Sequence, residues 1–247
     1  MISVVIFGFG NVGQHLYKAF KKRKVNVVQV YSPSLEVSEI KGTHFINDIT
    51  KVAIVDVYII AIKDDAIPNF SDSLPFENRL VVHTSGTSAL QNISAKQRRG
   101  VFYPPQTFSK DATLKWKNIP ICIEAENTED LQLLKQLGEK LSKKVVEVST
   151  EKRQELHLGA VWVNNFSNHL FHLAEDFWKE ANVDFDLLKP LMLETVKKLN
   201  SISPAEAQTG PAKRHAIKTM EAHLALLKDP KHKEIYTLLS ESIQSKF

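Results

Sequence analysis

The sequence predicts an α/β fold in which a domain with a mostly parallel sheet is followed by an all-α C-terminal domain. Three observations lead to this fold class. The chain opens on a buried strand that breaks at glycines and continues as a helix, strands and helices then alternate as far as residue 149, and only helical patterns follow. With 247 residues, 43% of them hydrophobic, the chain can fill two cores. We therefore expect a sheet domain over 1–149 and a helical domain over 150–247.

The elements of the sheet domain are predicted from short apolar runs, of which the one at 56–62 is not interrupted by charge, as is usual for parallel strands covered on both faces. The first run extends from Ile2 to Phe7 and leads through a glycine turn into an amphipathic helix over about 11–22. Further strands are predicted at 25–31, 56–62, 80–83, 100–103, 120–124 and 144–148, and a helix at 128–141.

The helical domain is predicted as four stretches, at about 150–181, 186–201, 211–228 and 231–245. Ser149 or Thr150 can cap the first of them. That first stretch is apolar on nearly all sides, so we expect it to be buried in a core or in a subunit interface.

Composition and charge argue against several classes of function. The 32 Lys and Arg exceed the 28 Asp and Glu by four, but no basic face with exposed aromatic residues is visible, so nucleic-acid binding is not expected. The single cysteine, Cys122, lies in an apolar run and is interpreted as a core thiol. No signal peptide or membrane-length apolar run occurs, which predicts a cytoplasmic protein without a membrane partner. No residue is assigned as a metal ligand.

The glycine turn carries the first functional signal. Gly8 permits a tight turn, Gly10 lets the backbone approach a pyrophosphate, and Gly13 lets the helix pack closely on the strand. Free N–H groups at the start of the helix then face the phosphates. The candidate cofactor-binding residues here are Gly8, Phe9, Gly10, Asn11 and Val12. A Rossmann-type domain that has lost its ligand would show the same pattern.

The end of the second strand is the place where an adenosine ribose is normally bound, and NAD-binding proteins carry an acidic residue there. In this sequence Ser32 and Ser34 occupy that place, and no acid occurs before Glu36. Hydroxyls can hydrogen-bond a 2′-phosphate that an aspartate would repel, so NADP is favoured over NAD as the cofactor. No arginine follows the strand directly, and an ordinary Ser-Pro turn explains the residues as well.

Two further strand ends are expected to line the ligand crevice, because ligands of parallel α/β sheets bind at the carboxyl ends of the strands. These ends contribute the candidate cofactor-binding residues Ile62, Lys63, His83, Thr84, Ser85 and Gly86. The short polar turn after the strand at 80–83 would approach the ribose and the nicotinamide. A histidine that merely caps its strand is an equally good interpretation of His83.

Polar residues recur along the predicted first helix of the helical domain. Their spacing of four, seven, four and seven places Arg153, His157, Asn164, Asn168 and Glu175 on one stripe if the helix is regular. Polar groups on a buried helix need partners, which a ligand or a hydrogen-bonded helix seam would supply. His157, Asn164 and Asn168 are the candidate catalytic residues, with His157 for proton transfer and the asparagines for substrate orientation.

A second helix start is predicted at Pro211, with Thr209 or Gly210 as its cap. Free N–H groups near Arg214 would suit a carboxylate or phosphate, which makes Gln208, Thr209, Gly210 and Arg214 candidates for binding an anionic substrate. A plain helix start explains the same residues nearly as well.

These motifs together resemble a bacterial family of Rossmann-like oxidoreductases whose C-terminal helical domain has no assigned function. The matching segments are Gly8-Phe-Gly-Asn-Val12, His83-Thr-Ser-Gly86, Tyr103-Pro-Pro-Gln-Thr-Phe108, Arg153-x-x-Leu-His157, Asn164-Asn-Phe-Ser-Asn-His169 and Gln208-Thr-Gly-Pro-Ala-x-Arg214. The family is similar to pyrroline-5-carboxylate reductase and the β-hydroxyacid dehydrogenases, which implies an NADP site between the two domains and homodimerisation through the helical one. Gln106 and Thr107 lie in a matching segment and are candidates for one wall of the substrate site.

The resemblance has one informative departure. The hydroxyacid dehydrogenases place a catalytic lysine one turn before an asparagine on the long helix, whereas Ala160 and Val161 stand at those positions here. The leading hypothesis is therefore an NADP-dependent oxidoreductase that acts on a small carboxylate-bearing imine or carbonyl compound. A non-catalytic NADP-binding sensor dimer is the alternative, and a dimer without a ligand is a third. The sequence leaves the identity of the substrate open.

Overall fold

The structure is a computed structural model that describes residues 1–247. It separates into two compact units, Met1–Asn164 and Asn165–Phe247, which we call the sheet unit and the helical unit. The division therefore falls within the predicted long helix, after residue 164 where the sequence suggested 149. The reason is local: the helix that begins at Thr150 is hydrogen-bonded to loops and strands of the sheet unit.

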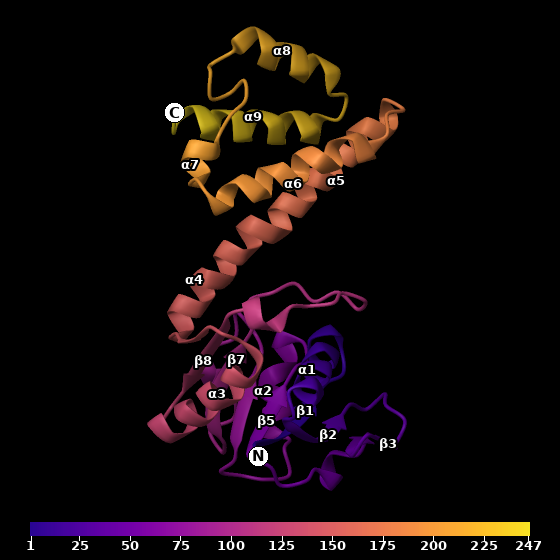
Figure 1. The fold of residues 1–247 in the computed structure, drawn as a ribbon, viewed down its shortest axis with the longest axis vertical. Helices are drawn as coiled ribbons and strands as arrows, with labels where there is room; N and C mark the ends of the chain where they lie inside the picture. Colours follow the sequence, from indigo (N-terminus) through magenta and orange to yellow (C-terminus); the bar gives the residue numbers. More distant parts are fainter. The chain divides into compact units, whose positions relative to one another are not determined.

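The sheet unit contains one nine-stranded sheet with the order β3-β4-β2-β1-β5-β6-β7-β8-β9 (Figure 1). Its strands are β1 Ser3–Phe7, β2 Asn26–Tyr31, β3 Ser38–Ile40, β4 Thr43–Ile46, β5 Val57–Ile60, β6 Leu80–His83, β7 Arg98–Tyr103, β8 Ile121–Ala125 and β9 Val145–Glu147. Neighbouring strands are parallel except for β3 with β4 and β7 with β8. The predicted α/β class and mostly parallel sheet are confirmed. The short strands β3 and β4 were missed, because neither is long enough to give a clear apolar run.

Helices cover both faces of the sheet. They are α1 Asn11–Lys22, α2 Ile67–Asp72, α3 Thr128–Leu141 and α4 Thr150–Ala160. Apolar side chains of α1 and α3 share one core with one face of the central strands, and Ile67 of α2 lies in a second core on the other face. Cys122 of β8 is buried beside Val101 and Tyr103, as expected of a core thiol, and burial raises the pKa of its thiol.

The order in which strands are added to the sheet reverses between β1 and β5. From β1 the chain moves outward to β2 and β4 on one side, and it then returns to add β5, β6 and β7 on the other. In open α/β sheets, ligands bind at this reversal, outside the carboxyl ends of the strands. The glycine turn follows β1, and thus lies at the reversal.

The predicted continuous helix over 150–181 consists of three segments. Helix α4 is followed by a π-helical segment, Val161–Phe166, and then by α5 Ser167–Glu180. A π turn holds more residues than an α turn, so side chains before and after it no longer follow a spacing of 100° per residue. The predicted single polar stripe is therefore wrong across this segment, although Arg153 and His157 lie on one face of α4.

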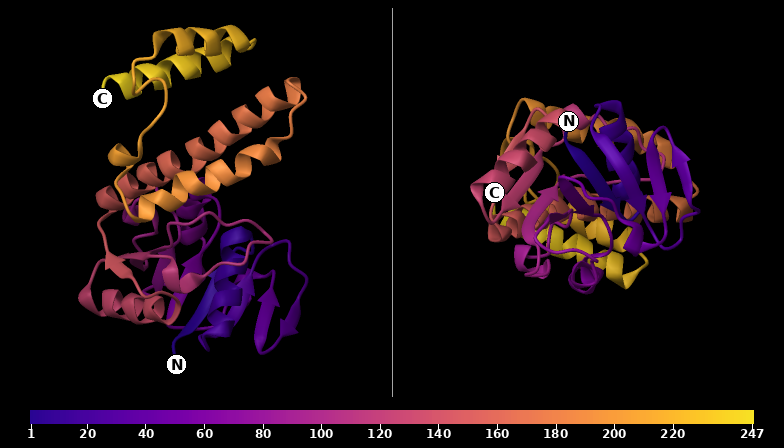
Figure 2. Two further views of the ribbon diagram at one scale, coloured as in Figure 1. Left: turned by 45° about the horizontal axis from the view of Figure 1, so that its top comes forward. Right: turned by 90° about the horizontal axis from the view of Figure 1, so that it is seen from below.

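The helical unit continues with α6 Lys189–Lys197, α7 Pro204–Ala207, α8 Ile217–Leu226 and α9 Pro230–Gln244. Helix α6 runs alongside α5, and α8 lies beside α9 (Figure 2). The ring of His223 on α8 is hydrogen-bonded to the Tyr236 hydroxyl on α9. One boundary is corrected: the helix predicted from Pro211 begins only at Ile217, and residues 211–215 form turns. No helix N-terminus therefore exists at Thr209 and Gly210.

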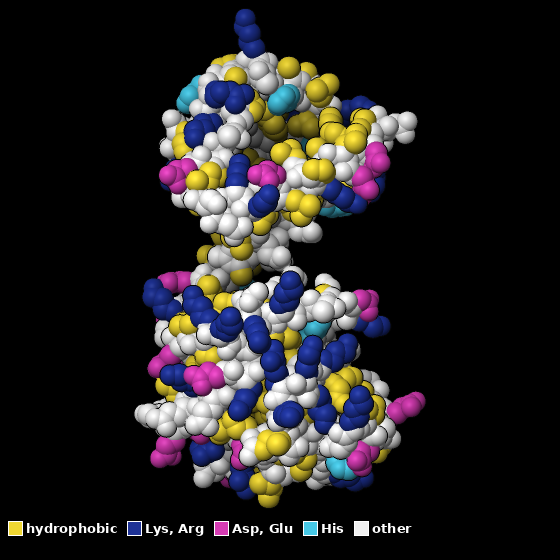
Figure 3. Space-filling model, viewed as in Figure 1, with side chains coloured by type: hydrophobic (Ala, Val, Ile, Leu, Met, Phe, Trp, Pro, Cys, Tyr) yellow, Lys and Arg dark blue, Asp and Glu magenta, His cyan; other side chains and the backbone are white.

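The helical unit exposes many large apolar side chains (Figure 3). Its only buried apolar residues are Ala207, Ala212 and Met220. The π-helical segment and the end of α4 are also open, with exposures of 58% for Leu158, 61% for Trp162 and 78% for Val163. The long apolar helix was expected to be buried either in a core or in a subunit interface. Burial in a core of the chain is not observed for these residues. None of the helices combines the length and apolarity needed to cross a membrane.

Candidate functional site

The glycine turn after β1 has the geometry that its spacing predicts. Gly8 has a positive φ of 96°, and a Cβ there would lie 2.4 Å from the carbonyl oxygen of Ala61. A Cβ on Gly13 would lie 2.1 Å from the carbonyl oxygen of Gly8, so no side chain fits where α1 packs on the turn. A Cβ on Gly10, in contrast, would meet nothing within 4 Å. The first and third glycines are thus needed by the fold, whereas the second leaves open space.

The open space at Gly10 lies at the N-terminus of α1. This twelve-residue helix starts from Gly10, receives no side-chain cap and carries no acidic residue in its first turn. Its first backbone N–H groups are therefore left to a ligand or to water, and the helix dipole favours a negative charge at this end. A pyrophosphate matches this combination of donors, dipole and space.

Two hydroxyl groups lie at the end of β2. Ser32 and Ser34 are in contact through their side-chain oxygens, 3.2 Å apart, and the backbone N–H of Ser32 donates to the carbonyl of Ile46. No carboxylate is hydrogen-bonded to either serine. The pair forms a small uncharged polar surface next to the glycine turn, since the backbone N–H of Gly8 donates to the carbonyl of Tyr31, the last residue of β2.

Asp64 lies in the loop after β5, directly after Ile62 and Lys63, and connects this loop to the loop after β6 through hydrogen bonds. Its carboxylate accepts hydrogen bonds from the hydroxyls of Ser85, at 2.7 Å, and Thr87, at 2.8 Å. The Ser85 hydroxyl in turn accepts from the backbone N–H groups of Thr87 and Ser88. The loop after β6 is consequently fixed from within, and Ser85 has a structural partner in place of a free hydroxyl.

His83, at the end of β6, is fully buried. Its Nδ1 accepts a hydrogen bond from the backbone N–H of Ser85, and its Nε2 faces the carbonyl oxygen of Ala89 at 3.3 Å. Burial and the nearby Arg153 guanidinium lower the pKa of His83 to about 4, so the ring is neutral and Nε2 carries its proton. The side chain is enclosed by the loop that follows β6.

The buried ring of His83 makes stability depend on pH. The unfolded chain binds a proton on this ring below its ordinary pKa of 6.5, whereas the folded chain does so only near pH 4. Lowering the pH from 7.5 to 5 should therefore reduce the free energy of unfolding by about 2 kcal/mol through this group. Urea titrations at several pH values measure the loss. In a His83→Gln variant, the free energy of unfolding should fall less steeply as the pH is lowered from 6.5 to 4. An unchanged slope would contradict the lowered pKa of His83.

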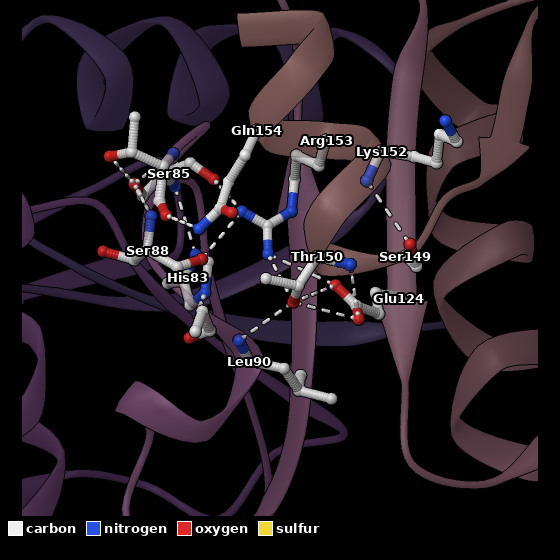
Figure 4. Close-up of polar contacts among 12 residues, drawn as sticks. His83, Ser85, Ser88, Leu90, Glu124, Ser149, Thr150, Lys152, Arg153 and Gln154 are labelled. Atoms are coloured by element: carbon white, nitrogen blue, oxygen red, sulfur yellow. Dashed lines mark hydrogen bonds and ion pairs between the residues drawn. The ribbon is translucent and has the colours of Figure 1, made fainter.

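Arg153 of α4 connects the helix to the loop after β6 (Figure 4). The guanidinium is fully buried, and its Nη1 donates to the carbonyl oxygens of Ser85, at 3.1 Å, and Ser88, at 2.7 Å. Its Nη2 donates to the Glu124 carboxylate and to the Thr150 hydroxyl. Thr150 also accepts from the backbone N–H of Leu90, so α4, β8 and the loop form one polar cluster. Such a buried ion pair with several hydrogen bonds fixes the geometry of the groups that it joins.

One turn further along α4, His157 lies against Gly86 and Tyr103. The Tyr103 hydroxyl is 3.2 Å from Nδ1 of His157, and the ring centroids are 6.2 Å apart in an edge-on arrangement. A Cβ on Gly86 would lie 2.5 Å from Nδ1 of His157 and 2.9 Å from Cζ of Tyr103. The glycine is thus required because both rings occupy the space of a side chain at position 86.

The remaining predicted site residues are less constrained. Asn164 ends the sheet unit on the π-helical segment, and the side chains of Gln106 and Thr107 lie in an exposed loop after β7. In the helical unit, Asn168 is exposed on α5, and Gln208, Thr209, Gly210 and Arg214 lie between α7 and α8. The backbone carbonyl of Gln208 accepts a hydrogen bond from Lys213. The structure therefore brings His157 to the loop at Gly86 within the sheet unit.

Sequence reasoning missed two residues of this arrangement, because Tyr103 entered it only as part of a motif and Glu124 was not considered. The signal for Tyr103 was its place at the carboxyl end of a buried strand, the rule already applied to His83. No local signal links Glu124 to Arg153, because 29 residues separate them and only the packing of α4 on β8 brings them together.

The strand order, the glycine turn and the open space at Gly10 define a Rossmann-type nucleotide-binding fold. Residues 119–243 match the model of the family described as a domain of unknown function, DUF2520. The chain belongs to this family. No curated protein matches it.

Three solved structures illustrate the likeness. A proposed NADP oxidoreductase from Bacteroides fragilis is 35% identical, with 99% of this chain and 98% of that chain covered and a TM-score of 0.86. A reductive aminase from Aspergillus terreus in complex with NADPH is 16% identical, with coverages of 99% and 93% and a TM-score of 0.69. Pyrroline carboxylate reductase from Plasmodium falciparum with NADP bound is 10% identical, with coverages of 100% and 99% and a TM-score of 0.60. The last two share the fold.

Proposed function

We propose that this protein is an NADP-dependent oxidoreductase that reduces a small imine or carbonyl compound bearing a carboxylate. The observation that carries the proposal is the turn at Gly10: open space, free N–H groups and a positive helix end coincide at the reversal of the strand order. Gly8, Phe9, Asn11 and Val12 would complete the pyrophosphate site. The similar proteins from Bacteroides fragilis and Aspergillus terreus support the reaction class, since the first is described as an NADP oxidoreductase and the second binds NADPH.

NADP fits the end of β2 better than NAD. Ser32 and Ser34 offer hydroxyls and no negative charge at the place where a ribose 2′-phosphate would lie. The loop from Thr84 to Gly86, together with Ile62 and Lys63, would line the nicotinamide side. When bound, the reduced nicotinamide would supply a hydride to the substrate.

The protein must then supply a proton and hold the substrate. His157 is the candidate proton donor, because its imidazole lies against Gly86 in the same loop. We further propose that Asn164 and Asn168 orient the substrate and that Gln106, Thr107, Gln208, Thr209, Gly210 and Arg214 bind its anionic group. For the segment from Gln208 to Arg214, the argument now depends on the Arg214 charge and not on a helix end, since α8 starts at Ile217.

We also propose that the protein is a homodimer through its helical unit. The unit buries few apolar side chains, and large ones on α6, among them Leu191, Leu193 and Val196, are more than 60% exposed. Faces of this kind are typical of obligate interfaces, which bury apolar surface extensively. Light scattering on the purified chain would give the mass of a dimer if the proposal is right.

Titration with NADPH and NADH, followed by protein and nucleotide fluorescence, tests the function. NADPH should bind at least about tenfold more tightly than NADH, a difference of roughly 1.4 kcal/mol. A screen of imino and keto acids with NADPH should then show turnover. Absence of binding by either nucleotide would refute the proposal, and tight NADPH binding without turnover would favour the sensor, an alternative consistent with Ala160 and Val161 at the lysine position.

A further inference from the structure

We propose that Tyr103 is a positioning residue for His157: its hydroxyl holds Nδ1 of the imidazole, so that Nε2 is the ring atom that exchanges a proton with the substrate. This inference rests on the proposed function, which assigns proton transfer to His157. It adds a residue from β7 and specifies the atom through which the proton passes.

The geometry gives His157 one fixed side and one free side. Nδ1 is 3.2 Å from the Tyr103 hydroxyl and lies where a Cβ of residue 86 would be, so this nitrogen is enclosed between a phenol and the loop. The imidazole is only partly buried, and Nε2 has no hydrogen-bond partner within the chain. Tyr103 itself is 8% exposed and sits in a core with Leu90 and Cys122. The rigid partner is therefore the tyrosine, and the accessible nitrogen is Nε2.

The Tyr103 hydroxyl remains protonated at all pH values at which the protein would work. Burial raises the pKa of Tyr103 to about 12, with Cys122 as the next contributor; Arg153 acts in the opposite direction, and Asp64 raises the pKa slightly. A protonated phenol can both donate and accept a hydrogen bond. It can thus donate to a bare Nδ1 of neutral His157 and accept from Nδ1–H of the imidazolium, and the contact persists in either state.

The proton balance of the reduction follows from this arrangement. In the imidazolium form of His157, Nδ1–H is held by the Tyr103 oxygen and Nε2–H points to the substrate. As the hydride adds to the carbon of the C=N or C=O bond, the Nε2–H bond breaks and the proton adds to the substrate nitrogen or oxygen. His157 is left neutral and keeps Nδ1–H on Tyr103. A proton from solvent then restores the imidazolium at Nε2.

A Tyr103→Phe variant tests the inference without activity, because phenylalanine keeps the packing and removes only the hydroxyl. In protein labelled with ¹⁵N-histidine, the signals of His157 are identified by their loss in His157→Gln. At a pH where the ring is neutral, Tyr103→Phe should move the Nδ1 signal of His157 and change the ratio of the two tautomers. A packing role alone would leave both unchanged, and unchanged signals would overturn the proposal.

The chain offers a matched control. In the helical unit, the Tyr236 hydroxyl is 2.8 Å from Nδ1 of His223, with the ring centroids 5.8 Å apart. Tyr236→Phe should move the signals of His223 and leave those of His157 and the reductase activity unchanged. Loss of activity in this control, with an effect as large as in Tyr103→Phe, would show that the kinetic test lacks specificity.

On a substrate found in the screen, Tyr103→Phe should lower kcat about tenfold or more, with KM and the affinity for NADPH within about twofold of the wild type. Gly86→Ala provides a second variant, since it retains both side chains and forces them apart, and it should reproduce the change in the His157 signals. Failure of the wild type to bind NADPH would refute the proposed function instead, whatever the spectra show. A full effect on the spectra with normal kcat would refute the role of Tyr103 in proton transfer.

Discussion

Replacing Gly10 by valine is expected to abolish NADPH binding while the protein stays folded. The position has no neighbour within 4 Å of a Cβ and no positive φ, so the fold tolerates a side chain there. The valine would instead fill the space at the N-terminus of α1 that a pyrophosphate needs. Affinity should fall at least about a thousandfold, equivalent to roughly 4 kcal/mol. Fluorescence titration measures the binding, and thermal unfolding confirms that the fold is retained.

Gly13→Ala is the contrasting variant in the same turn. Its Cβ would lie 2.1 Å from the backbone oxygen of Gly8, so the backbone itself must shift. This variant should lower the unfolding temperature markedly even without a ligand. If Gly10→Val unfolds as readily as Gly13→Ala, or if it binds NADPH like the wild type, the division of roles between the two glycines is wrong.

Replacing Arg153 by methionine is expected to cost about 3–5 kcal/mol of the free energy of unfolding. The methionine fills much of the volume of the side chain but leaves the Glu124 carboxylate and the carbonyls of Ser85 and Ser88 without their donor. Buried acceptors that lose a charged partner are destabilising to this degree. Chemical denaturation gives the value directly, and the loop after β6 should become more accessible to proteases.

The adjacent residue supplies the control for this prediction. Lys152 is exposed and pairs only with the exposed Glu155, so Lys152→Met removes the same charge at the same helical turn without any buried partner. It should leave the free energy of unfolding unchanged. Adding Glu124→Gln to Arg153→Met should restore part of the loss, because the pair is then removed together. A loss of less than about 1 kcal/mol in Arg153→Met would show that the cluster does not hold α4 in place.

Local patterns predicted most of the sheet unit. The helix over 11–22 and the roles of Gly8 and Gly13 follow from periodicity and sterics within a few residues, and the structure reproduces both. The boundaries in the helical part were harder to predict. A π turn over 161–166 has no distinct residue pattern, and Pro211 suits a turn as well as a helix start, which is why the polar stripe and the helix at Pro211 were misplaced.

In the candidate site, too, some features follow from local sequence patterns and others do not. Residues at strand ends were predicted because the sheet topology alone places them at one edge, but their individual roles depend on long-range contacts. His83 and Tyr103 end neighbouring strands, yet His83 is buried within the loop after β6 and Tyr103 contacts His157. No spacing rule distinguishes them, since the distinction arises from where α4 packs on the sheet.

The glycine turn is tied to strands on both of its sides. The backbone N–H of Gly8 donates to Tyr31 at the end of β2, and the N–H of Ala61 beyond β5 donates to Phe7, both at 2.8 Å. Three strands therefore determine where the turn lies, and a change in one of them cannot relocate it independently. Because backbone hydrogen bonds to both neighbouring strands hold the turn, the side chains of the loops around it can be replaced without moving it.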